Sequence, residues 1–280
     1  MFVVLVTFLG NFIVGGLIGI CGIAGFLLPM MYAGLLGFSV GQSLALSFLA
    51  FFVSGVIGSV NYHKQGNLDI RFSLILGAGS FAGGLLGVKL NALVTPSQAK
   101  LLLYLVVLLS GLSILLRKEK PAAKGGSSGG NGNGSGNGNG NSSNGSISLP
   151  RSAPRDGLLG STVFVILFGF VTGAICSLSG AGGPVLVMPL LVALGMPVHM
   201  SIGIALFDSV FIALPACAGY MMQCDLSQIG LLVAVTVLAH GGGVLLGSSN
   251  AHKIKQKPLK MGVAIFSICL SIYMIGSMML

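Results

Sequence analysis

The sequence has few charged residues. Only 7% of its 280 residues are charged, and aspartate and glutamate together number five. Soluble globular domains carry about a quarter charged residues. Because 54% of the residues are also hydrophobic, this composition excludes an ordinary soluble enzyme or binding module. The expected surroundings of the chain are a lipid bilayer.

Several signatures of chemical function are missing as well. The five cysteines, Cys21, Cys176, Cys217, Cys224 and Cys269, show no C-x-x-C spacing, so neither a disulfide framework nor a metal site is expected. No Walker motif is present, which excludes a recognisable ATP-driven machine. We therefore expect no enzyme activity, no cofactor and no metal.

Long apolar segments recur along the chain instead. A helix needs about 20 apolar residues to cross the hydrocarbon core of a bilayer, and continuous apolar runs lack the alternation of a membrane β-barrel. The sequence therefore predicts an all-α polytopic membrane protein. The net charge of +9 comes from basic residues in short loops, which indicates topology signals and no nucleic-acid partner. The segments cover residues 2–36, 40–62, 70–92, 98–116, 158–194, 198–222, 226–249 and 258–279.

The chain divides into two related halves. Residues 125–146 contain only Gly, Asn and Ser, a composition typical of a flexible linker. We assign residues 1–119 to a first transmembrane repeat, 120–156 to the linker and 157–280 to a second repeat. A shift of 160 positions superposes Gly22 on Gly182, Pro29 on Pro189 and Lys100 on Lys260. Each half has a glycine-broken first segment followed by three further transmembrane helices.

The basic residues indicate how the halves are oriented. In short loops, Lys and Arg accumulate on the cytoplasmic side of the membrane. If each half crosses the membrane an odd number of times, twelve of the 14 Lys and Arg share one face; an even number gives no clear excess. We therefore predict inverted-topology repeats in the cytoplasmic membrane, with the linker cytoplasmic and both termini outside. Three and five crossings per half both remain open.

The glycine-rich interruptions are the candidate substrate-binding residues. Glycine permits backbone conformations closed to other residues, and proline suits the first turn of a new helix. A helix would then begin inside the membrane, where its positive end favours an anion. The alternative is that these glycines only allow close helix packing. The candidates are Gly22, Ile23, Ala24 and Gly25 in the first half, and Ser179, Gly180, Ala181, Gly182, Gly183 and Pro184 in the second.

A few polar residues lie within the apolar segments. Asp208 and His240 are candidates for proton coupling, either as a pair or as separate relay points, because ionisable residues inside a membrane are costly and usually functional. The alternative is a buried pair that fixes helix packing. Ser43, Ser47 and Ser209 are candidates for a polar path to the substrate, although serines in membrane helices often bond their own backbone.

Three stretches resemble one known family. They are GAGGPVLVMPLLVALGMP (Gly180–Pro197), HMSIGIAL (His199–Leu206) and HKQGNLD (His63–Asp69). All three are similar to the TauE/SafE sulfite exporters, also called 4-toluene sulfonate uptake permeases. The resemblance implies transport of sulfite, thiosulfate or an organosulfonate such as sulfoacetate. The chain departs from the family pattern in CGIAGF, which is more apolar than usual, and in MMQCD, which lacks a basic residue and a glycine.

The leading hypothesis is thus a secondary transporter of a small sulfur-containing anion, driven by an ion or proton gradient. Its partners would be the anion and the lipid bilayer, and self-association into a homo-oligomer is left open. The alternatives are a transporter of another solute such as a metal cation, and a membrane-embedded enzyme or assembly factor. An enzyme would need a convergent nucleophile, base or metal set.

The linker offers a test of the topology. Asn133, Asn141 and Asn144 each begin an N-x-Ser sequon, and a sequon is modified only on the non-cytoplasmic side. We expect no glycosylation at any of the three when the chain is expressed in a eukaryotic host. A mass increase that a glycosidase removes would place the linker on the opposite side.

Overall fold

A computed structural model describes residues 1–22, 24–95, 157–224 and 226–251, together with scattered residues between 97 and 112 and between 261 and 276. Three predicted features lie outside the described residues. They are the glycine-rich part of the linker, most of the segments 98–116 and 258–279, and the candidate residue Ile23. In the described part the chain is helical and contains no strand.

Among the described residues, six helices are long and apolar enough to cross a membrane, which confirms the prediction of an all-α polytopic membrane protein. With lengths of 18 to 25 residues, they extend about 27 to 38 Å at 1.5 Å per residue. They are α1 (Phe2–Cys21), α3 (Val40–Lys64), α4 (Ile70–Asn91), α6 (Thr162–Ser179), α8 (Val198–Met221) and α9 (Leu226–Asn250).

The first segment of each half is broken, as the glycines predict. In the first half, α1 ends at Gly22, which has the left-handed φ of 72°. A 3₁₀ turn (Ala24–Phe26), the short helix α2 (Leu27–Met30) and a π-helical turn (Met31–Leu35) follow. In the second half, α6 ends at Gly180 with φ 77°, and the chain continues as α7 (Gly183–Ala193).

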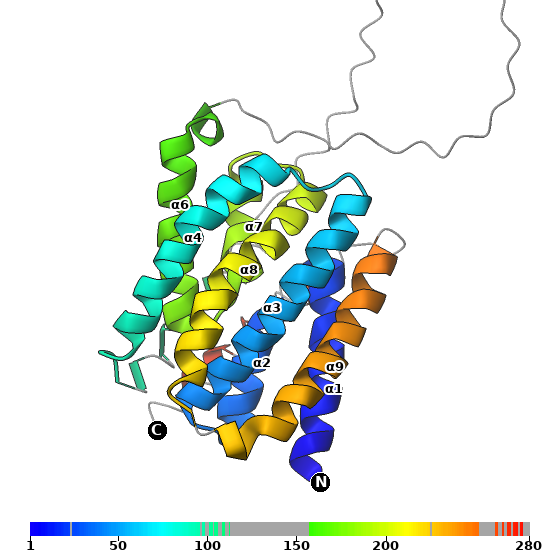
Figure 1. Cartoon of the computed structure of the whole chain (residues 1–280), viewed down its shortest axis with the longest axis vertical. Helices are drawn as coiled ribbons and strands as arrows, with labels where there is room; N and C mark the ends of the chain where they lie inside the picture. The colour runs from blue at the N-terminus through cyan, green and yellow to red at the C-terminus, as the bar shows by residue number, and fades with distance from the viewer. Residues whose placement is uncertain are drawn as a thin grey trace, which may run out of the picture.

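The two halves interlock. Helices α3 and α8 pack against each other at the centre, α4 packs on α6 at one side, and α1 packs on α9 at the other. Every one of these pairs combines a helix from each half, so neither half forms a separate body. Figure 1 shows α1 and α6 running in opposite directions, and the same holds for α3 and α8 and for α4 and α9.

The correspondence between the halves differs from the single shift of 160 positions. The left-handed glycines that end α1 and α6 differ by 158 (180 − 22). The hydroxyls of Tyr62 and Tyr220, also 158 apart, donate to carbonyl oxygens 43 positions earlier. In α4 and α9, however, Gly83 and Gly243 make equivalent contacts 160 apart. The second half therefore has two more residues between Tyr220 and Gly243 than the first half has between Tyr62 and Gly83.

Glycines allow the outer pairs to pack closely. A Cβ atom on Gly79 or Gly83 of α4 would overlap a backbone carbonyl oxygen of α6, and one on Gly243 or Gly247 of α9 would overlap a carbonyl oxygen of α1. Small residues let membrane helices approach backbone to backbone. Close packing of this kind is therefore the structural role of these four glycines on the helix faces.

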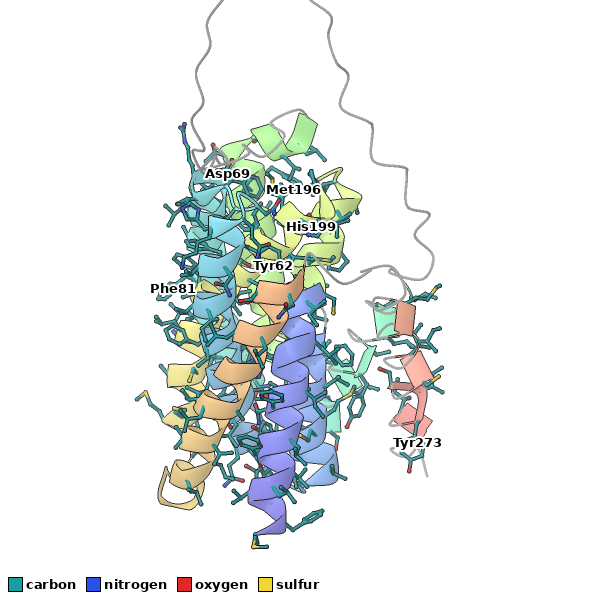
Figure 2. All side chains as sticks on the ribbon, turned by 90° about the vertical axis from the view of Figure 1, so that its right-hand side faces the viewer. Tyr62, Asp69, Phe81, Met196, His199 and Tyr273 are labelled. Atoms are coloured by element: carbon teal, nitrogen blue, oxygen red, sulfur yellow. The ribbon has the colours of Figure 1, made fainter. Side chains whose placement is uncertain are left out.

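Large apolar side chains cover the outer face of these pairs. Leu74 and Leu85 of α4 and Leu167 of α6 are about half exposed, and Figure 2 shows Phe81 pointing away from the helices. Water would solvate such a surface poorly, whereas lipid chains match it. Asp69 and His199 both lie towards the same end of the molecule in Figure 2. The Asp69 carboxylate accepts the Phe72 N–H (3.1 Å) and caps α4.

We predict that Gly83→Ala destabilises the protein. The new methyl group would overlap the carbonyl oxygen of Phe170, and overpacking of this kind costs about 1–3 kcal/mol. Circular dichroism during heating in detergent should show the melting temperature falling by several degrees. Gly230→Ala is the control, because nothing lies within 4 Å of a Cβ there. Equal melting temperatures for the two variants would contradict the packing argument.

Candidate functional site

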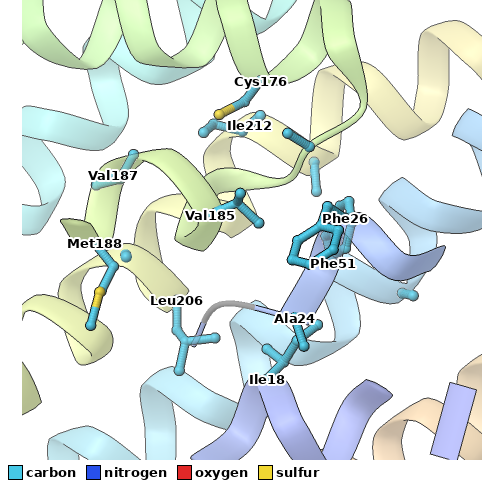
Figure 3. Packing of buried hydrophobic residues seen from close by; sticks show 14 of the residues in the cluster. Ile18, Ala24, Phe26, Phe51, Cys176, Val185, Val187, Met188, Leu206 and Ile212 are labelled. Atoms are coloured by element: carbon cyan, nitrogen blue, oxygen red, sulfur yellow. The ribbon is translucent and has the colours of Figure 1, made fainter. Parts of the chain in front are cut away.

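The two helix breaks meet at the centre of the molecule. A Cβ on Gly25 would lie 2.9 Å from the ring of Phe51 and 3.6 Å from the carbonyl oxygen of Ala181. A Cβ on Gly182 would lie 2.9 Å from the same ring. One aromatic side chain from α3 therefore contacts both breaks, and Figure 3 shows it beside Phe26.

The second break has the geometry that its glycines and proline predict. Gly182 precedes α7 with φ 76° and ψ 148°, a conformation open only to glycine, and Pro184 lies in the first turn of the helix. Ala181, Gly183 and Pro184 are buried. The amino-terminal end of α7, which carries the positive end of the helix dipole, therefore lies within the protein core.

The first break is more apolar. Gly22 packs against Ile202 of α8, with 3.1 Å from its Cβ position to the side chain, and Gly25 packs against Phe51. The following turn has no side-chain cap at Phe26. Ala24 is buried and has no polar side chain. The candidates Gly22, Ala24 and Gly25 thus adjoin the site, but its polar atoms come mainly from the second half.

The hydroxyl groups of the candidate serines donate hydrogen bonds within their own helices. Ser43, Ser47 and Ser209 donate to the carbonyl oxygen four residues earlier, at 2.8, 2.7 and 2.8 Å. This is the alternative that the sequence left open for them. Ser209 nevertheless lies at the break, with its Oγ 2.9 Å from the Cβ position of Gly183. Ser179 accepts the Ala181 N–H at 3.3 Å and so supports the turn.

Asp208 lies beside the second break. It is fully buried next to Ser209, and neither carboxylate oxygen has a hydrogen-bond partner among the described residues. Cys176 of α6 and Ser80 of α4 lie close enough to interact with it, but the Ser80 hydroxyl donates to the carbonyl oxygen of Gly169 (3.2 Å). A buried carboxylate without partners is costly to maintain, which is typical of a functional group.

His240 lies in a different place. It is also fully buried, and both of its ring nitrogens lack hydrogen-bond partners in the described part of the chain. Its Nδ1 lies 3.2 Å from the Cβ position of Gly15, in the middle of α1. Asp208 faces α4 and α6, whereas His240 faces α1. The arrangement therefore gives two separate positions and no Asp208–His240 pair.

The sequence reasoning missed three aromatic residues at the site. The Tyr62 hydroxyl donates to the carbonyl oxygen of Gly19 (3.3 Å), and that of Tyr220 donates to Ser177 (2.9 Å), so each tyrosine satisfies a carbonyl near the end of a broken helix. Phe51 fills the space between the breaks. The tyrosines carried a signal, because they occupy equivalent places at a shift of 158. Phe51 coincides with Phe211 at the shift of 160, but that match does not indicate a contact with the breaks.

Comparisons with known proteins agree with this architecture. Residues 3–274 match the model of the family described as "Sulfite exporter TauE/SafE". The "Probable membrane transporter protein YdhB" of Bacillus subtilis (strain 168) is 23% identical over 238 residues, which cover 85% of this chain and 84% of that protein. No solved structure matches significantly.

Proposed function

The chain belongs to the TauE/SafE sulfite exporter family, and on that premise we propose that it is a secondary transporter of a small sulfur-containing anion. Sulfite, thiosulfate and organosulfonates are the candidate substrates. Membership makes the protein a multi-pass membrane protein of a transporter family. The particular anion, the coupling and the orientation are part of the proposal.

The observation that carries the proposal is the amino-terminal end of α7 inside the core. Backbone N–H groups and the helix dipole favour an anion at such an end. The described Lys and Arg side chains, Lys64, Arg71 and Lys89, are exposed, whereas the break is buried, so none of them supplies positive charge at the break. Helix dipoles can hold an anion there without burying a cation.

Asp208 would couple the anion to a proton. An ionised carboxylate beside the break would repel an incoming anion, because like charges strongly disfavour each other in a poorly solvated interior. A proton on Asp208 removes this repulsion. Anion and proton would then occupy the site together and cross in the same direction.

Helix directions and charge support the proposed orientation of the halves. Corresponding helices run in opposite directions in Figure 1, and Lys64 and Arg71 lie at the end where α6 begins. By the positive-inside rule this end faces the cytoplasm. The proposal therefore keeps inverted repeats, a cytoplasmic linker and external termini. Alternating access in such folds moves one repeat against the other around a central site.

We predict uptake of labelled sulfite, thiosulfate or sulfoacetate into proteoliposomes under an imposed pH gradient. Gly182→Ala should lower that uptake about tenfold or more, because a left-handed or extended positive-φ position strains alanine by about 1–3 kcal/mol and the methyl group would meet Phe51. Gly195→Ala is the matched control, with φ 95° and nothing within 4 Å. The site assignment is wrong if both variants transport equally.

We further predict that Asp208→Asn uncouples transport from the pH gradient. An amide cannot carry the proton, so the rate should fall about tenfold and lose its pH dependence. Asp69→Asn is the control, since it removes the other described carboxylate yet keeps a good helix cap. Uptake by Asp208→Asn at the wild-type rate with the wild-type pH dependence would remove Asp208 from the mechanism.

A further inference from the structure

A second group of buried polar side chains lies away from the helix breaks, between α1, the π-helical turn and α9. It consists of Thr7, Asn11, Tyr32, Thr236 and His240, and each of them has an exposed fraction of 0%. Thr7 and Asn11 are four residues apart on α1, as are Thr236 and His240 on α9, so each pair shares a helix face. We call this group the α1–α9 cluster.

Hydrogen bonds join most of the cluster. The Asn11 amide nitrogen donates to the carbonyl oxygen of Thr7 (2.8 Å) and to the hydroxyl of Tyr32 (2.7 Å). The Tyr32 hydroxyl also lies 3.0 Å from the Thr236 hydroxyl. The side chains of α1, the π-helical turn and α9 therefore converge on one position.

Four atoms of the cluster are left without a partner in the described structure: Asn11 Oδ1, Thr7 Oγ1 and both ring nitrogens of His240. A buried polar atom without a partner is energetically costly, so these atoms favour a ligand that pairs with them. Asn11 Oδ1 can only accept a hydrogen bond or bind a cation. Because an anion would be repelled by this oxygen, the missing partner is a donor or a positive charge.

The cluster is not a consequence of the repeat. At the shifts that relate the halves, the counterpart of Asn11 is Gly169, and that of His240 is Ser80. These residues lie together in the α4–α6 pair and lack the amide and the imidazole. In the described structure these amide and imidazole groups therefore occur in the α1–α9 pair and not in the equivalent α4–α6 pair.

We propose that the α1–α9 cluster binds a monovalent cation, either Na⁺ among its oxygens or a proton on His240. This inference rests on the proposed transport function, for which a cation supplies the driving gradient and balances the anion. Hydroxyl and amide oxygens are ligands that hard cations prefer. Since no described carboxylate takes part, the site suits a monovalent cation better than a divalent one.

The surroundings of His240 contain few competing charges. On α1 it adjoins Gly15 and the backbone of Asn11. On α3 the residues next to the adjacent Gly241 are the apolar Val53 and Ile57. Tyr32 is the other ionisable residue of the cluster, and its hydroxyl lies within hydrogen-bond distance of Asn11 and Thr236. The two described carboxylates, Asp69 and Asp208, have other neighbours.

Thermal unfolding without any anion tests the proposal independently of transport. We would follow helix content by circular dichroism in detergent, replacing choline chloride with NaCl at constant ionic strength and separately varying pH from about 5 to 8. A bound ion stabilises the folded state in proportion to the logarithm of its concentration above Kd. The wild type should gain a few degrees from Na⁺ or from acidification.

Variants identify the site and the ion. If Na⁺ is bound, Tyr32→Phe and Thr236→Val should weaken its apparent affinity about tenfold, as expected for one lost ligand. If a proton is bound, His240→Gln should abolish the pH-dependent gain. Thr172→Val is the matched control, because the Thr172 hydroxyl is buried but donates within α6. Equal responses in all four variants would overturn the proposal.

Binding of radiolabelled Na⁺ to the wild type covers the case in which the variants do not fold. A wild-type chain that binds no Na⁺ and melts at the same temperature across this pH range would overturn the inference. The transport proposal would survive that result, since anion uptake depends on the helix breaks. Conversely, a chain that binds the cation but takes up none of the tested anions would support the cation site and contradict the proposed substrate.

Discussion

The pairing of backbone polar groups is the constraint on which the rest of the structure depends. In a bilayer, carbonyl and N–H groups that leave a helix find no water, so a helix can be broken only where protein covers the break. Here Gly22 and Gly180 interrupt α1 and α6 in the core. The hydroxyls of Tyr62 and Tyr220 donate to carbonyl oxygens near the two ends. The breaks are therefore supported features of the fold.

This cover comes from the opposite half as well as from the same one. Because glycines of α4 and α9 press against the backbones of α6 and α1, the halves approach closely, and both breaks reach Phe51. Small residues thus have two functions in this chain. Those at left-handed positions turn the backbone, and those on helix faces bring the halves together.

The scaffold is symmetric, but its polar residues are not. Asp208 adjoins the second break, where its counterpart in the first half is Ala50 at a shift of 158. The α1–α9 cluster lies in the opposite helix pair. Different polar groups on two copies of one scaffold thus give the chain two separate buried polar positions while the packing of both copies is kept.

The sequence by itself determined that the protein lies in a lipid bilayer, that it is helical and where both helix breaks lie. Apolar run length and left-handed glycines are local properties, which explains why the bounds of α3, α4 and α8 agree with prediction within two residues. Only the tertiary structure decided which side chains meet. It separated Asp208 from His240, placed Phe51 between the breaks, and joined Asn11 to Tyr32 and Thr236. It also corrected the shift between the halves near the breaks, because such contacts depend on helix packing and not on spacing along the chain.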